Sequence, residues 1–272
     1  MNRFVWLAAL AAIVAVPGLA KERIELDEKL PVVIDPARAY VLYSGETKFP
    51  MSLIRTVDAN ERATWATARA AALAKAQAKS VRARKKYEDE LATWNGLGPT
   101  VRALYAAPTA PVAVSDSDFA YPPPELANFV YTARPFSKSD RGFTYLIAVP
   151  PGRYTVYGPQ NAISTGVFGA LCMCMGSIAF DAVPGKVVSL GRFTNKFGAN
   201  PIFTFERAKA SDPVLPALAS IGVTPAHLVA AGKMPNYNGT LIGRLAPIEG
   251  VLAYRRDTVI DVASAKEAVA LP

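Results

Sequence analysis

The sequence predicts a mainly β protein: a β-sandwich with one long inserted α-helix and a small helical C-terminal region. Short β-rich runs recur at sandwich-like intervals, separated by Pro- and Gly-rich turns. One stretch, from Asp58 to Trp94, contains neither Gly nor Pro, which is typical of a long helix. Hydrophobic residues make up 51% of the chain and charged residues 19%, so there are enough apolar side chains for a packed core.

Residues 1–20 have the form of a bacterial secretory signal. Arg3 precedes an apolar run from Phe4 to Val16, and small residues follow up to Ala20. The run is shorter than the roughly 18 to 20 apolar residues that cross a bilayer, and no later stretch reaches that length. We therefore expect cleavage after Ala20 and a soluble mature chain in the periplasm or outside the cell.

Residues 21–57 are expected to supply the first strands of the sandwich. The run Arg38–Tyr43 is rich in β-forming residues and ends at a Ser-Gly pair, which indicates a strand and a turn. Ser52–Val57 has the same character and is predicted to be the return strand of this pair.

Residues 58–95 are predicted to form the long helical insertion. Asp58 and Glu61 have the spacing of a capping box, and Asn95-Gly96 provides a stop. Such a helix measures roughly 55 Å, whereas a compact domain of about 200 residues is roughly 40–45 Å across. The helix should therefore extend beyond its own domain.

The side chains of this helix divide into two faces. Tyr87, Leu91 and Trp94 follow helical spacing, and Trp65 joins the same apolar stripe. Three arrangements stay open for the helix: packing on the sandwich, an oligomerisation arm, or a helix on a membrane or wall surface. A separate basic face completes the candidate interaction residues, which are Trp65, Lys75, Lys79, Arg82, Lys86 and Trp94.

The remaining chain is predicted to contain a Pro-rich connector (96–124), the main β-sandwich (125–207) and a helical segment with a closing strand (208–272). The helical pieces are expected at Asp212–Ile221 and Thr224–Ala231, the second with Pro225 in its first turn. From Asp261 onward the chain has the character of a loose tail. The strands are expected at Asn128–Thr132, Phe143–Val149, Arg153–Tyr157, Ser177–Phe180, Lys186–Leu190, Pro201–Phe205 and Gly250–Arg255.

The segment Val149-Pro150-Pro151-Gly152-Arg153-Tyr154-Thr155-Val156 resembles the hydrophobic-x-Pro-Gly-x-Tyr hairpin of prealbumin-like and carboxypeptidase-regulatory-like β-sandwiches. The later run 184–191 resembles the strand that follows in such sandwiches. The chain also looks similar to uncharacterised alphaproteobacterial envelope proteins with a Cys-x-Cys-Met-Gly segment between the two motifs. Those relatives are mostly non-catalytic modules, so the resemblance implies a sandwich and no catalytic residue.

One cluster has residue types that indicate a specific chemistry, Cys172-Met173-Cys174-Met175. Its four soft sulfur ligands suit Cu(I). In a strand the two Cys side chains share one face and the two Met the other, so they do not converge on one ion. A Cys172–Cys174 disulfide needs a kinked backbone, because same-face positions in a strand are too far apart. Buried structural thiols, a local disulfide and a metal site all stay open.

The sequence gives little support to other metal sites, to common catalytic motifs or to nucleic-acid binding. His227 is the only histidine, which excludes multi-histidine zinc sites and disfavours a Ser-His-Asp triad. There is no P-loop. The net charge of +8 suits anionic lipids or wall polymers, but no nucleic-acid recognition motif accompanies it.

We therefore expect an exported, non-enzymatic envelope protein without a cofactor. It would act as an interaction or structural module, by self-association or by contact with a wall or membrane component. Two alternatives stay open. One is a copper-binding or redox-responsive protein that uses Cys172 and Cys174, and the other is a hydrolase that uses paired carboxylates.

Overall fold

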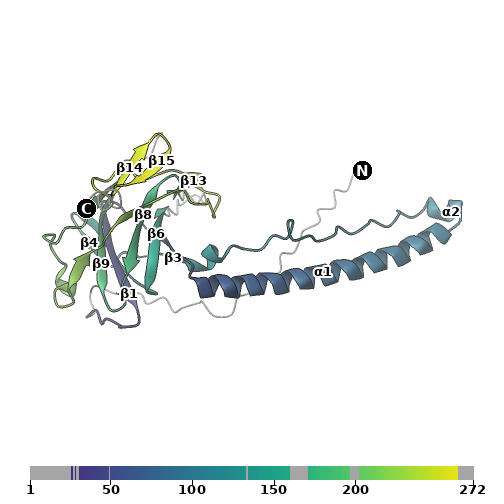
Figure 1. Ribbon diagram of the computed structural model, residues 1–272, viewed down its shortest axis with the longest axis horizontal. Helices are drawn as coiled ribbons and strands as arrows, with labels where there is room; N and C mark the ends of the chain where they lie inside the picture. Colours follow the sequence, from purple (N-terminus) through teal and green to yellow (C-terminus); the bar gives the residue numbers. More distant parts are fainter. Residues whose placement is uncertain are drawn as a thin grey trace, which may run out of the picture.

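The computed structural model describes residues 26, 28, 31–48, 50–132, 134–159, 171–196 and 202–262. It shows a two-sheet β body from which one long helix projects (Figure 1). The expected signal segment 1–20 and the end of the expected tail lie outside the described residues. No helix in the described ranges has both the length and the apolar character needed to cross a bilayer.

The first sheet is mixed, with strand order β10-β9-β1-β5-β4 and β11 also beside β9. At its centre, β1 pairs in parallel with β9 and antiparallel with β5. β11 and β10 follow one another along the same edge of β9. The strands are β1 (Ala39–Gly45), β4 (Ser137–Ser139), β5 (Gly142–Val149), β9 (Val187–Lys196), β10 (Ile202–Arg207) and β11 (Val223–Pro225).

The second sheet has the order β12-β8-β6-β2-β3 and is antiparallel throughout. Two short pairs accompany it: β7 with β13, and the β14–β15 hairpin. The strands are β2 (Met51–Arg55), β3 (Phe129–Tyr131), β6 (Gly152–Pro159), β7 (Leu171–Cys172), β8 (Ser177–Ala182), β12 (Val229–Ala231), β13 (Leu241–Ile242), β14 (Leu252–Arg255) and β15 (Thr258–Asp261).

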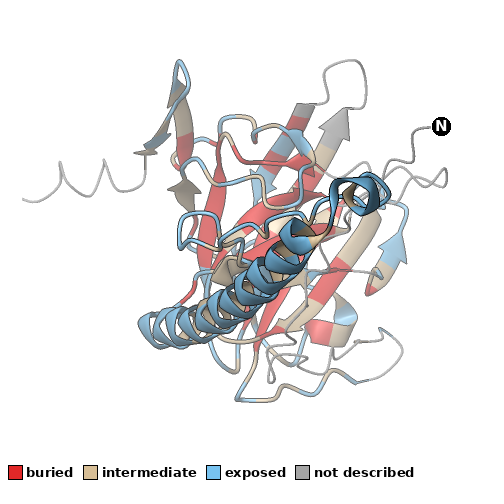
Figure 2. Ribbon diagram, turned by 90° about the vertical axis from the view of Figure 1, so that its right-hand side faces the viewer, coloured by how far each residue is buried: buried red, intermediate tan, exposed pale blue. Residues whose placement is uncertain are grey.

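The main core lies between the two sheets. Because strand side chains alternate between faces, Val41 and Tyr43 of β1 point inward and meet Leu53 and other residues of the second sheet. Aromatic side chains from both sheets fill much of this space, and Figure 2 shows the buried strands behind an exposed helix. The buried aromatic residues of this core are Tyr43, Tyr145, Tyr154, Phe180, Phe193, Phe203 and Phe205.

Each sheet also buries part of its outer face. On the first sheet, Tyr40 and Val187 pack with Leu218 of the 3-10 helix η2 (Pro216–Leu218). On the second sheet, Ile54 and Tyr157 pack with the two cysteines. Both faces of the sandwich therefore carry covering segments.

The long helix α1 (Ala59–Gly96) has 38 residues, which corresponds to about 57 Å. It leaves the end of β2 and extends away from the body, as Figure 1 shows. At its far end lies the short helix α2 (Pro99–Arg102), and the chain then returns in extended form to the 3-10 helix η1 (Pro124–Asn128). The expectation that the helix extends beyond its domain is confirmed.

Two predicted hairpins are wrong. β1 and β2 lie in different sheets, and so do β5 and β6, although each pair is joined by a short connection. The Pro150-Pro151 step joins the two layers, because Tyr154 of β6 pairs with Phe180 of β8 and not with β5. The strand bounds predicted from composition were close, whereas the pairing partners depend on contacts between distant segments.

The predicted helical C-terminal region is also wrong. Asp212–Ile221 contains only the three-residue η2, and Thr224–Ala231 contains the end of β11 and the whole of β12. Pairing of Val223–Pro225 with β9 overrides the local Thr-Pro capping signal, since Pro is also tolerated at a strand end. The closing run forms the separate β14–β15 hairpin, which extends into Asp261, where the loose tail was expected.

Candidate functional site

The base of the projecting helix is fixed to the body by a buried polar cluster. Arg55, the last residue of β2, donates from its Nη2 to Glu61 of α1 and to Oδ1 of Asn128, 2.7 Å away. The side chains of Arg55 and Glu61 are 12% and 26% exposed. Because Asn128 ends η1, this one guanidinium ties both ends of the projecting segment to the sheet.

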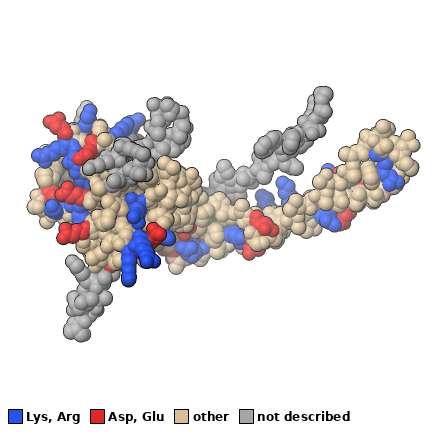
Figure 3. All heavy atoms as spheres, turned by 90° about the horizontal axis from the view of Figure 1, so that it is seen from above, with Lys and Arg blue, Asp and Glu red and all other residues tan. Residues whose placement is uncertain are grey.

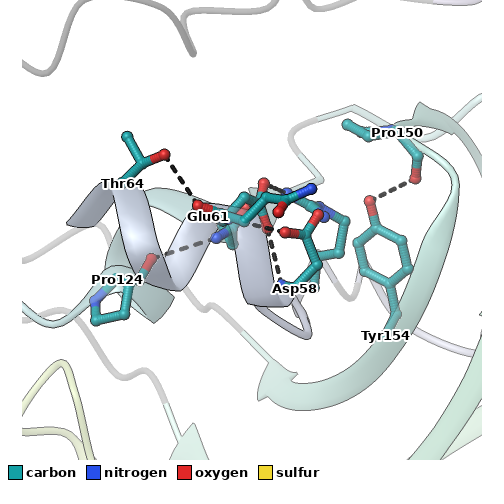
Figure 4. A network of polar contacts seen from close by, with 9 residues as sticks. Asp58, Glu61, Thr64, Pro124, Pro150 and Tyr154 are labelled. Atoms are coloured by element: carbon teal, nitrogen blue, oxygen red, sulfur yellow. Dashed lines mark hydrogen bonds and ion pairs between the residues drawn. The ribbon is translucent and has the colours of Figure 1, made fainter. Parts of the chain in front are cut away.

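The first turn of α1 is capped as the sequence predicts. The Asp58 carboxylate accepts from the backbone N–H of Glu61 at 2.8 Å, and the Glu61 carboxylate accepts from the backbone N–H of Asp58 at 3.1 Å (Figure 4). Beside this turn, the hydroxyl of Tyr154 donates to the carbonyl oxygen of Pro150 at 2.7 Å. Burial raises the pKa of Tyr154; nearby Arg55 acts to lower it and Glu61 to raise it further.

The returning segment, residues 103–123, lies along one stripe of α1, and we call α1, α2 and this segment together the arm. The indole Nε1 of Trp65 donates to the carbonyl oxygen of Pro122 at 2.7 Å, and its ring packs near Tyr121. Arg69 forms an ion pair with Asp116 at 2.6 Å, and Ser80 donates to the carbonyl oxygen of Val112 at 3.2 Å. The apolar stripe thus has a partner within its own chain.

The helix does not pack on the sandwich, so the simplest of the three arrangements is wrong. None of the 38 residues of α1, all of which the structure describes, is buried. The physical reason is that alanine dominates the first half of α1, and alanine buries little apolar area when it packs on a sheet. The apolar stripe of this half is therefore narrow, and a single extended chain can cover it.

The predicted basic face lies on the arm in full contact with solvent. Lys75, Lys79, Arg82 and Lys86, which we call the basic stripe, are all exposed. Lys86 is 3.4 Å from the carboxylate of Glu90, while the described residues provide no ion pair for the other three. Between positions 75 and 86 there are six basic and no acidic residues. This side of the arm therefore attracts negative charge.

The far end of the arm contains a mostly apolar groove of about 720 Å³, which we call the tip groove. Trp94 lies in its wall with Arg102 stacked over the ring at 5.3 Å, and its buried Nε1 has no hydrogen-bond partner among the described residues. Leu104 and Tyr105 beside it are 77% and 63% exposed, and Figure 3 shows that much of the tip is uncharged. The lining residues are Lys86, Asp89, Glu90, Thr93, Trp94, Leu97, Val101, Tyr105, Ala106 and Pro108.

Of the six candidate interaction residues, four lie together on one open face of α1, and the two tryptophans contact other parts of the arm. The basic stripe is accessible, whereas Trp65 contacts the returning segment and Trp94 lines the tip groove. Sequence reasoning missed the anchor residues Arg55 and Asn128, which are 73 positions apart and carry no local signal. It also missed Leu104 and Tyr105, although an apolar pair at the turn of a projecting segment was a usable signal.

The two cysteines lie far from the arm tip and are bonded to each other. The chain leaves β7 at Cys172 and turns through Met173–Gly176, where the N–H of Gly176 donates to the carbonyl oxygen of Met173. The Cα atoms of Cys172 and Cys174 are 5.0 Å apart, so the backbone has the kink that a disulfide between them requires. Both cysteines pack in the outer cluster with Tyr157, while Met173 lies in the main core, as the expected alternation of faces requires. The interpretation as free thiols is wrong.

A copper site at this pair stays a prediction for the reduced chain, because thiolates are the metal ligands and a disulfide offers none. In the described part of the chain, no group of three or more His, Cys, Asp and Glu side chains is placed to hold a metal ion. His227 lies exposed between β11 and β12, outside both sheets' cores.

Fold and site together define a β-sandwich that carries a projecting helical arm between two neighbouring strands, anchored at its base by Arg55. Comparisons with protein-family models, with curated proteins and with solved structures found no match. The functional argument therefore depends on the arm itself.

Proposed function

We propose that this protein is an exported, non-enzymatic interaction module of the cell envelope, which uses its arm to contact a partner. One observation carries the proposal: the 38-residue helix α1 extends beyond the body, and none of its residues is buried. The structure describes every residue of this helix. Ordering a long segment costs conformational entropy, and the arm regains little of it through burial within its own chain. Contact with a partner accounts for such an element.

The anchoring supports the same proposal. The Arg55 cluster and the capping box hold the first turn of α1 against the sheet, and the returning segment contacts the helix from Trp65 to Ser80. The arm therefore presents its surface at a defined direction from the body. Preorganisation of this kind lowers the entropic cost of binding.

Export is tested separately from the arm. Sequencing the N-terminus of protein from a periplasmic or culture fraction should find a chain beginning at Lys21, after cleavage at Ala20. Recovery of full-length chain in the cytoplasm alone would contradict export.

The arm is tested by site-specific photocrosslinking in cells that express the intact chain. A photoreactive amino acid replaces either Thr93, an exposed residue of α1 that lines the tip groove, or Val183, exposed in the β8–β9 turn of the body. We expect a discrete adduct from position 93 and none from position 183. Equal adducts from both positions, or none from position 93, would overturn the proposed role of the arm.

A further inference from the structure

The charge pattern of α1 points to the kind of partner, and we propose that the arm binds a second copy of this chain as an antiparallel pair that crosses near Tyr87 and Glu88. This inference rests on the proposed function and names the partner of the same arm. In the resulting twofold dimer, the basic stripe of each copy lies against the tip groove of the other.

The sequence around the crossing point is self-complementary in charge. Arg84-Lys85-Lys86 precedes Tyr87, and Glu88-Asp89-Glu90 follows it. When two copies run antiparallel about this point, the members of the triplets that face the partner lie side by side: Lys86 of each copy lies beside Asp89 and Glu90 of the other. A parallel, in-register pair would place like charges side by side, so the pattern selects the antiparallel arrangement.

The basic stripe and the tip groove lie on the same side of α1. At 100° per residue, Lys79, Lys86 and Thr93 project within about 40° of one another, and the helical part of the groove continues that line through Leu97. In the antiparallel pair, Lys86 then meets Asp89 and Glu90 of the partner subunit. One surface of each helix therefore supplies both halves of the contact, as a twofold interface requires.

Further along α1 the stripe faces uncharged residues. About the same crossing point, Arg82 lies beside the partner's Thr93, and Lys79 lies beside the partner's Leu97 at the end of the helix. The aliphatic stems of Lys and Arg cover apolar surface while their charged ends stay in water, which suits a groove with apolar walls.

The decisive experiment is charge complementation between two variants of the intact mature chain, followed by sedimentation equilibrium. Lys86→Glu and Glu90→Lys should each weaken the homodimer at least about tenfold, because each places like charges across the interface. An equimolar mixture should restore dimers, since glutamate at position 86 of one chain then meets lysine at position 90 of the other. Restoration in the mixture separates the interface from the Lys86–Glu90 contact within one helix, which both variants lose.

Arg84→Ala provides the matched control. Arg84 forms its 2.9 Å ion pair with Glu88 on a different side of the helix from the tip groove, so its loss should change the dimer constant by less than about threefold. Circular dichroism should show the same helix content in all three variants. A wild-type dimer that both charge reversals leave intact would overturn this interface.

Spin labels test the antiparallel arrangement directly. For labels that replace Val81, the separation along the arm between the two copies should be about 20 Å, and for labels that replace Ala70 about 50 Å. Equal separations at both positions would contradict the antiparallel pair.

The nature of the partner is resolved by two further outcomes. A wild-type chain that stays monomeric and sediments with phosphatidylglycerol vesicles, but not with phosphatidylcholine vesicles, would replace the second copy by an anionic membrane. A photoadduct from position 93 with a different protein would likewise overturn the self-pairing. Either result leaves the arm as a contact element, whereas the absence of any adduct removes the proposed function itself.

Discussion

Arg55 shows how much of the architecture depends on one side chain. It is the last residue of β2, and it joins Glu61 at the start of the arm to Asn128 at its end. A largely buried guanidinium with two partners leaves a carboxylate and an amide without compensation when it is removed.

Replacement of Arg55 should therefore destabilise the protein well beyond an ordinary surface change. We expect Arg55→Ala to lower the free energy of unfolding by about 2–4 kcal/mol, measured by urea denaturation. Arg84→Ala, which removes an ion pair whose two side chains are each 59% exposed, should cost less than about 0.5 kcal/mol. Similar losses of unfolding free energy in the two variants would show that the contacts of Arg55 with Glu61 and Asn128 contribute no more than an exposed ion pair.

Buried tyrosines predict a loss of stability in alkali. Burial raises the pKa of both Tyr43 and Tyr154, so the folded state favours their neutral, protonated forms. This contribution is fully present below the unfolded-state pKa of about 10 and is lost as the pH rises from there toward the raised folded-state values. The free energy of unfolding should stay level up to about pH 9 and fall above pH 10. In Tyr154→Phe the fall should be shallower, and a fall of unchanged slope would exclude Tyr154 as a cause.

At the scale of elements, the Cys172–Cys174 disulfide fixes a loop on which several backbone contacts depend. Cys172 accepts from the N–H of Gly243, and Cys174 accepts from the N–H of Met234. The bond closes a very short loop, so the unfolded chain loses little entropy through it, about 1–2 kcal/mol.

Removal of this disulfide should act locally. We expect the double variant Cys172→Ala, Cys174→Ala to lose about 2 kcal/mol of stability and to exchange amide hydrogens faster at Met234 and Gly243. The amides of β1, which pair in the first sheet, serve as the internal control and should keep their protection. Faster exchange in β1 as well would show that the bond supports the whole sandwich.

The elements differ in how far the sequence could predict them. The bounds of α1 were predicted to within a residue or two, because a capping box and an uninterrupted run without Gly or Pro are local signals. Thr224-Pro225 carried an equally local helix signal, but pairing with β9 decided its structure. The same limit applies to the site: the basic stripe follows from helical spacing, whereas the Arg55–Asn128 contact joins residues that only the fold brings together.

At the scale of the whole molecule, the arm makes the monomer elongated. An arm of about 57 Å added to a body of roughly 40–45 Å gives a maximum dimension of about 100 Å. Small-angle X-ray scattering at low protein concentration should find this value and a strongly asymmetric distance distribution. A symmetric distribution that ends near 60 Å would show that the arm folds back onto the sandwich in solution.

The arm leaves and re-enters the body at two strands that are hydrogen-bonded neighbours, since Leu53 of β2 pairs with Val130 of β3. A short turn would satisfy the same pair of strands, so the sandwich places no limit on the number of residues between them. Seven residues added to α1, matched by about three residues in the extended return, lengthen the arm by about 10.5 Å and rotate what lies beyond them by only about 20°. An insertion of two residues would instead add about 3 Å and rotate everything beyond it to the opposite side. Insertions and deletions in the arm can thus change how far it reaches and which way its surface faces without touching the core.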